Sequence, residues 1–429
     1  MVHTKIPTLK AITVSVCVSI LLSMSALAEA AGAHNNPNQS GREREKTETA
    51  ECAESHSALT LSDGDTILCG TYTAEGENES VLEASSSVEA SVTGAVLQKL
   101  SGSASSADAS SFRGVNAAVR AYGNAVIRLS HCEIQASASD ATGVFAYENS
   151  TIYMDNCTVN VTGGGAGGVQ VAGGGTLIGK NSRVTSASKA AIRSDRGGGT
   201  MILDGGTYTS TGSNGCPAIY STADITVRNA ECVSTSSRAV IIEGKNSVSL
   251  ENCTLTGNDQ STKEGSVKAN VLLYQSASGD ASVGTSVFTM TGGSMTARSG
   301  AMFYCTNTAG KICLSNAELA LSESNDLLIV SSGRWGKEGR NGGECELYAK
   351  NQELKGNISV DSMSSLLMDL RSSTFSGAIQ GEGNVNVSMD SDSRWVLSGD
   401  SSVTSLDGDL SGLDLNGHQL YINGVLYGE

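Results

Sequence analysis

Carboxylate and histidine side chains are the groups in this chain that could carry acid–base chemistry, and they are thinly spread. A glycoside-hydrolysing site needs two carboxylates that flank the scissile bond, one of which acts as the acid. The central part of the sequence offers five separated aspartates: Asp140, Asp155, Asp195, Asp204 and Asp224. The histidines beyond residue 28 are likewise isolated from one another: His34, His56, His131 and His418. An acid–base pair would therefore have to be assembled by the fold from distant segments.

Metal and phosphate sites have weak support in the sequence. Asp63 and Asp65 stand on either side of a glycine, but two carboxylates fall far short of the oxygen set of a calcium loop, so a turn is favoured there. Calcium stays a weak alternative, and no other cofactor is expected. The glycine triplets lack the Gly-Lys-Ser/Thr of a phosphate loop, and no Cys-x-x-Cys or zinc-type His/Cys spacing occurs.

A cluster of basic residues around a tryptophan departs from the acidic background. Arg334, Trp335, Lys337 and Arg340 lie in the glycine-rich stretch 332–343. Trp and Arg are enriched where proteins recognise their partners, which makes these four residues candidates for ligand binding. An insertion loop whose Trp packs against its own fold explains the same residues, so both interpretations stay open. The stretch 258–266 is a lesser candidate of the same kind.

A repeat of about 24 residues is the strongest pattern in the chain. It is marked by tripeptides with a small central residue, often preceded by Asn, as in Asn156-Cys157-Thr158. Their central residues are 132, 157, 182, 206, 230, 253, 293 and 317, so six of the seven steps span 23 to 25 residues and one spans 40. Short runs with period-2 alternation flank each tripeptide, which is typical of stacked β-coils. The pattern predicts an all-β chain, a single parallel β-solenoid of roughly twelve coils, with an insertion in the long step.

The tripeptides also predict which residues become neighbours. Small central residues fit inside a sharp bend, and the preceding Asn fits a turn. Asp155 and Asp204 share one coil position, which elsewhere holds residues of either charge or none, so a solvated turn is expected there rather than a carboxylate site. The other residues at this position are Ser130, Lys180, Arg228, Glu251 and Ser315.

The chain holds 11 cysteines, of which 10 follow residue 28. Cys132 and Cys157 fall at equivalent coil positions, where stacked buried thiols are favoured over a disulfide because in-register side chains point the same way. Two local disulfides are plausible from sequence proximity. They would join Cys52 to Cys69 and Cys305 to Cys313.

The first 28 residues read as a secretory signal peptide. Lys5 and Lys10 precede an apolar run over 11–22, and Ala26-Leu27-Ala28 has the small-x-small pattern of a cleavage site. A polar lead-in is expected over 29–58 and the solenoid over 59–429. The protein is therefore expected to be exported, secreted or at the cell surface, with no membrane-spanning segment in the mature chain.

Net charge narrows the classes of partner. The whole chain carries a formal charge of -16; without Lys5 and Lys10, 26 basic residues face 44 acidic ones, which gives -18. An acidic surface argues against nucleic acid and anionic membranes as partners. An extracellular protein or glycan partner is expected instead.

The segment from Leu59 to Tyr72, with Asp63-Gly64-Asp65-Thr66-Ile67 and Gly70-Thr71-Tyr72, resembles the opening coil of bacterial extracellular right-handed parallel β-helix repeat proteins. The glycine-, serine- and asparagine-rich coils from 114 to 327 resemble those of adhesin-like surface proteins, including autotransporter passengers. The resemblance implies a right-handed β-helix and an extracellular role. It does not select a function, because this fold carries polysaccharide-degrading enzymes, adhesins and stalks alike.

Three hypotheses of function follow. The first is a non-enzymatic, adhesin-like protein with a binding or structural role. The second is a polysaccharide-active enzyme, pectate-lyase-like or a glycoside hydrolase; against it, the Asn-x-Asp, Asp-Asp and Gly-His-Gly signatures of such enzymes are missing from the sequence. The third is a spacer, or a fragment of a longer surface protein. Carboxylates gathered on one face would favour the enzyme, and an uninterrupted Ser/Thr/Asn face would favour the adhesin.

Overall fold

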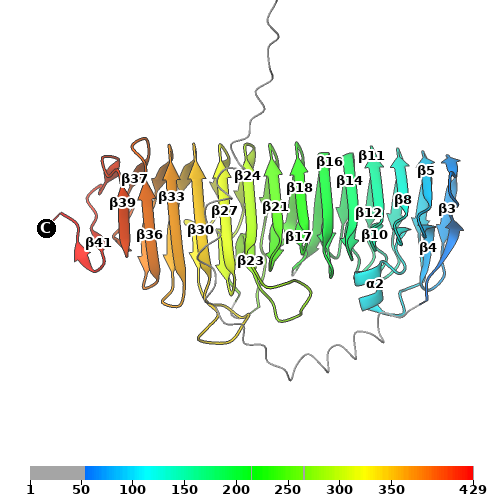
Figure 1. The fold of residues 1–429 in the computed structure, drawn as a ribbon, viewed down its shortest axis with the longest axis horizontal. Helices are drawn as coiled ribbons and strands as arrows, with labels where there is room; N and C mark the ends of the chain where they lie inside the picture. Colours follow the sequence, from blue (N-terminus) through cyan, green and yellow to red (C-terminus); the bar gives the residue numbers. More distant parts are fainter. Residues whose placement is uncertain (1–53, 214, 264–265, 429) are drawn as a thin grey trace, which may run out of the picture. The chain divides into compact units, whose positions relative to one another are not determined.

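The described part of the chain winds into a parallel β-helix (Figure 1). The structure is a computed structural model that describes residues 54–213, 215–263 and 266–428. The predicted signal peptide, most of the predicted lead-in and Cys52 lie outside these residues. The first strand begins at His56, slightly ahead of the boundary expected at residue 59. The predicted all-β parallel solenoid is confirmed.

One long sheet, sheet A, receives a strand from almost every coil. Within the described residues it has 13 strands, close to the roughly twelve coils predicted. These strands are β1 (His56–Thr60), β4 (Glu79–Ala84), β7 (Val119–Ala121), β10 (Val144–Tyr147), β13 (Val169–Ala172), β15 (Ile192–Ser194), β17 (Ile219–Ser221), β20 (Val240–Glu243), β23 (Ala269–Tyr274), β26 (Ala301–Thr306), β29 (Asp326–Val330), β32 (Asn357–Val360) and β35 (Ile379–Gly381).

Sheet B is formed by the remaining strands of most coils, usually two per coil with a bend between them. Its strands are β2 (Thr66–Leu68), β3 (Thr71–Ala74), β5 (Glu89–Thr93), β6 (Val96–Lys99), β8 (Val126–Ser130), β9 (Glu133–Ala136), β11 (Thr151–Asp155), β12 (Thr158–Val161), β14 (Gly175–Ser186), β16 (Gly199–Ser213), β18 (Asp224–Arg228), β19 (Glu231–Ser236), β21 (Ser247–Glu251), β22 (Thr254–Gly257), β24 (Ser286–Thr291), β25 (Ser294–Ala297), β27 (Ala309–Ser315), β28 (Glu318–Leu321), β30 (Glu344–Lys350), β33 (Ser365–Arg371), β36 (Asn384–Met389) and β39 (Ser405–Gly408).

Two small sheets complete the C-terminal coils. One contains β31 (Glu353–Lys355), β34 (Thr374–Ser376), β37 (Arg394–Val396) and β40 (Leu413–Asp414), and the other contains β38 (Ser401–Val403), β41 (Leu420–Ile422) and β42 (Val425–Leu426). The pair β41–β42 is antiparallel and ends the stack.

The strand register follows the repeat that the sequence predicts. Asp155 pairs with Ser130 on one side and with Lys180 on the other, and Lys180 pairs with Asp204. Equivalent residues of successive coils therefore lie directly above one another. The predicted mixed-charge row is confirmed, and Arg228 and Glu251 form an ion pair of 3.1 Å within it.

The bend between the two strands of a coil explains the tripeptide. The residue before the small central residue adopts a left-handed backbone, with φ between 47° and 54° at His131, Asn156, Asn181, Asn229, Asn252 and Asn316. Asn tolerates this conformation better than most residues. The small side chain that follows is enclosed by the bend; Cys157, for example, is 1 % exposed.

Alternating side chains fill the interior of the solenoid. One inward row runs through eight coils in register, and each member is at most 1 % exposed: Ile127, Ile152, Leu177, Met201, Ile225, Val248, Phe288 and Ile312. Burying one such side chain contributes about 1.5–3 kcal/mol. The core is thus a set of apolar ladders, one for each inward position of the coil.

The cysteines are free thiols throughout the described residues. Cys132 and Cys157 are stacked and buried, as favoured from the sequence. The predicted Cys305–Cys313 disulfide is not formed, because Cys305 faces the core from sheet A while Cys313 sits in the half-buried outward row of sheet B. Cys69 is exposed and free, and its pairing with Cys52 stays a prediction.

Excursions between coils cover part of the outer face of sheet A (Figure 1). They are the segment around helix α2 (Ala107–Arg113) and the loops 258–263 with 266–268, 275–285 and 331–342. Outward residues of sheet A are consequently buried, with Gln170 at 0 % and Tyr304 at 1 % exposure. Among the described residues, no helix is long and apolar enough to cross a membrane.

Candidate functional site

Buried carboxylates from different coils lie on the covered side of sheet A. Asp195 forms an ion pair with Arg193 across 2.7 Å. Glu243 accepts hydrogen bonds from the hydroxyl groups of Tyr274, at 2.9 Å, and of Tyr220. An enzyme on this fold would need such carboxylates within reach of its substrate, so their accessibility decides how they are interpreted.

These carboxylates are buried and already bonded. Asp195, Glu243 and Asp259 are only 1–2 % exposed. Glu243 also receives the hydroxyl group of Ser276, and Asp259 pairs with Arg238 across 2.9 Å. Burial, with the nearby Glu243 charge adding to it, raises the pKa of both tyrosines, so they remain neutral donors to this carboxylate. Such groups hold loops onto the sheet, and a polysaccharide cannot reach them without moving those loops.

The predicted loop of Arg334 and Trp335 belongs to the same covered face. Trp335 is half-buried, with its ring centroid 4.7 Å from that of Tyr274. The Asn341 side-chain amide donates to the carbonyl oxygens of Gly333, at 2.6 Å, and Trp335, at 2.8 Å, which fixes the loop. The indole therefore packs against the fold, as one of the two interpretations expected.

The four candidate residues of this loop do not act as one group. The Arg334 guanidinium carbon lies 4.3 Å from the Trp335 ring centroid, and its side chain borders a pocket. Lys337 and Arg340 are exposed and do not line that pocket. The structure thus brings Arg334 and Trp335 together and leaves the other two apart.

A polar ladder on the outer face of sheet B was not singled out from the sequence. Its members are in register through five coils and carry amide or hydroxyl groups: Gln98, Gln135, Asn160, Thr185 and Thr209. The Gln98 amide donates to Gln135 across 3.0 Å. Val233 interrupts the row, and Thr256 and Thr296 continue it. The sequence contains a signal that could have revealed the ladder. From Gln135 onward, each member lies three residues after the central residue of a repeat tripeptide.

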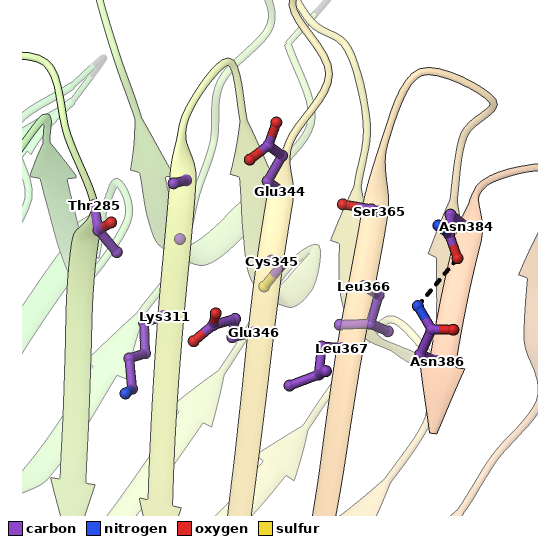
Figure 2. Close-up of a pocket in the computed structure, with 12 residues that line it drawn as sticks. Thr285, Lys311, Glu344, Cys345, Glu346, Ser365, Leu366, Leu367, Asn384 and Asn386 are labelled. Atoms are coloured by element: carbon purple, nitrogen blue, oxygen red, sulfur yellow. Dashed lines mark hydrogen bonds between the residues drawn. The ribbon is translucent and has the colours of Figure 1, made fainter. Parts of the chain in front are cut away.

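A shallow groove lies farther along sheet B, over β24 to β36, with a volume of about 470 Å³ (Figure 2). Lys311, Glu346, Leu367 and Asn386 form a row across its floor in strand register. Figure 2 shows these side chains next to one another, with Asn386 donating to Asn384 across 3.1 Å. Leu367 is 42 % exposed, so the groove offers one apolar contact among polar groups.

The Asp63 and Asp65 carboxylates accept hydrogen bonds from backbone amides. Asp65 accepts from the Ser62 amide at 2.7 Å, and Asp63 accepts from the Glu89 amide at 3.1 Å. In the described parts of the chain, no three His, Cys, Asp or Glu residues are placed to hold a metal ion together.

No known protein family, no curated protein and no solved structure matches the chain.

Proposed function

We propose that the protein is an exported, non-enzymatic binding protein that contacts an extracellular partner, a neutral glycan above all, through the polar ladder of sheet B. The ladder carries this proposal. It repeats hydroxyl and amide groups at the spacing of adjacent strands, about 4.8 Å. Such groups both donate and accept hydrogen bonds, as the hydroxyl groups of a glycan do.

The groove of Figure 2 lies farther toward the C-terminus on sheet B, on the strands that precede the bend of each coil, and adds a second polar surface that supports the proposal. Its floor combines polar side chains with the exposed Leu367. A glycan offers apolar C–H surface as well as hydroxyl groups, so a mixed floor suits it. The long sheet would engage an extended partner through many weak contacts.

The alternative, a polysaccharide-active enzyme, is favoured by one observation, the presence of carboxylates from different coils on the covered side of sheet A. Their burial and their saturation with donors weigh against it. A general acid or base must reach the proton that it transfers.

Binding to an array of neutral glycans tests the proposal. In the test variant, Thr185→Glu and Thr209→Glu place two charges and extra bulk on adjacent ladder positions. In the control variant, Ser359→Glu and Gln380→Glu make the same change in charge at an exposed, adjacent pair on sheet A. We expect the ladder variant to bind its glycan at least tenfold more weakly, a change of about 1.4 kcal/mol, and the control to change less than twofold.

Both variants should retain the β-rich circular dichroism of the unmodified protein. Equal binding by the two variants would contradict the role of the ladder, and so would an array on which the unmodified protein retains no neutral glycan.

A further inference from the structure

A pocket of about 440 Å³ lies beside the Arg334 loop and concentrates positive charge on an otherwise acidic protein. It is lined by Gly215, Arg238, Ser261, Thr262, Lys263, Ser266 and Arg334. Three of these residues are cationic and three carry hydroxyl groups. Residues 214 and 264–265 lie outside the described residues.

Arg238 forms the buried wall of the pocket. Its side chain is 8 % exposed and pairs with Asp259, whose side chain is 1 % exposed. One Nη2 hydrogen is donated to the carbonyl oxygen of Val267 at 2.6 Å. A guanidinium has five N–H groups, so these contacts with described residues leave it able to donate to a further acceptor.

The other two cations meet no carboxylate among the described residues. Arg334 and Lys263 are exposed, and Arg334 is held against the ring of Trp335. Trp335 is in turn packed on Tyr274, so Arg334 is oriented before any ligand arrives. Burial lowers the pKa of Arg238, and the nearby positive charge of Arg334 adds to this effect. An anion placed in the pocket would relieve the repulsion between the two guanidinium groups.

We infer that this pocket binds a single oxyanion group, a sulfate or a carboxylate, carried by a sugar-sized molecule. Arg recognises such oxyanions through paired N–H donors. The volume lies within the range of small-molecule pockets, roughly 300–1,000 Å³. The net charge of the chain, -16, disfavours long polyanions, so one charged group on a small ligand fits better than a polymer of them. The inference does not depend on the ladder of sheet B, which uses other residues.

Isothermal titration calorimetry of the full protein provides the test, with glucose 6-sulfate, glucuronate, inorganic sulfate and glucose as probes. The pocket variant carries Lys263→Gln and Arg334→Gln. The control carries Lys337→Gln and Arg340→Gln, which removes the same two charges from exposed residues outside the pocket. We expect one charged sugar to bind, glucose not to bind, and the pocket variant to lose at least tenfold in affinity while the control changes less than twofold.

Two outcomes would overturn the inference. One is an unmodified protein that binds none of the anions. The other is an equal loss in both variants, which would indicate general electrostatic attraction. If inorganic sulfate bound as tightly as glucose 6-sulfate, the sugar part would not be recognised. That result would contradict the inference of a sugar-sized ligand and indicate a site for the free anion. Neither the ladder variant nor its control should alter these titrations.

Discussion

Lys189 shows how single residues on the covered face of sheet A carry a cost in stability. Its ammonium group donates to the Ser111 hydroxyl group at 2.7 Å beneath the α2 segment. Burial lowers its pKa to about 8, and the neighbouring charge of Arg193 acts in the same direction; Asp195, Asp140 and Cys216 oppose the shift. The folded state therefore disfavours the charged form of Lys189.

The pH dependence of stability follows from that sign. The pKa of Lys189 in the folded protein, about 8, lies below the ordinary value of 10.5. The buried positive charge therefore lowers the free energy of unfolding by its full amount below pH 8, and this loss shrinks as the pH rises toward 10.5. We expect Lys189→Met to raise the melting temperature at pH 7 more than at pH 10. The exposed Lys350→Met serves as the control.

The comparison should stop at pH 10. Burial raises the pKa of Tyr220 and Tyr274 above the ordinary value of 10.0, so their contribution to stability is lost only above that pH. A melting temperature that responds to Lys189→Met equally at both pH values would show that Lys189 is not held at a cost.

At the residue scale, the sequence predicted contacts within the repeat better than contacts across it. The stacking of Cys132 on Cys157 followed from equal coil positions. Cys305 and Cys313 are close in sequence, yet the alternation of inward and outward side chains separates them. The contact of Trp335 with Tyr274 joins an insertion loop to strand β23 of sheet A, and the repeat does not predict it.

The bend of each coil is the element on which the stack depends. Asn252 occupies it with φ of 52°, a conformation that costs most L-residues about 1–2 kcal/mol and β-branched residues more. Asn252→Val should lower the free energy of unfolding by about 1–2 kcal/mol, whereas Asn252→Gly should change it little, because glycine adopts this conformation freely.

Thr254→Val is the matched control for this prediction, since it introduces the same side chain in the strand that follows the bend, where β-branched residues are favoured. Thermal and urea unfolding measure all three variants. If Asn252→Val were no more destabilising than Thr254→Val, the bend would not require a left-handed residue.

The elements that the sequence did not place are the excursions over sheet A. The repeat predicted an insertion in the long step between residues 253 and 293, but where an insertion lies depends on pairs such as Arg196 with Asp280, 84 residues apart. Arg238 is likewise held by contacts outside the repeat, with Asp259 and with Val267, which is 29 residues away. The coils could be predicted because each one repeats the same local chemistry. The loops do not repeat, so their positions could not be predicted from the sequence.

At the scale of the whole molecule, the solenoid presents two unlike faces. Loops held by buried ion pairs cover part of sheet A and block a polysaccharide from it. Sheet B carries the polar ladder and the groove on its outer face. Each coil rests mainly on the coils beside it, so the length of the ladder grows with the number of coils. We therefore expect an extended partner to bind along sheet B, whereas the proposed anion pocket lies among the loops that cover sheet A.

Glycan binding without catalysis can be examined in a single experiment. The protein is incubated with acidic and neutral polysaccharides, with and without calcium, and new reducing ends, the ultraviolet absorbance of unsaturated uronates and bound glycan are followed in the same samples. We expect no turnover on any substrate together with retention of a neutral glycan. Turnover of any polysaccharide would contradict this expectation. If Glu243→Gln or Asp195→Asn abolished that turnover, the active site would lie on sheet A.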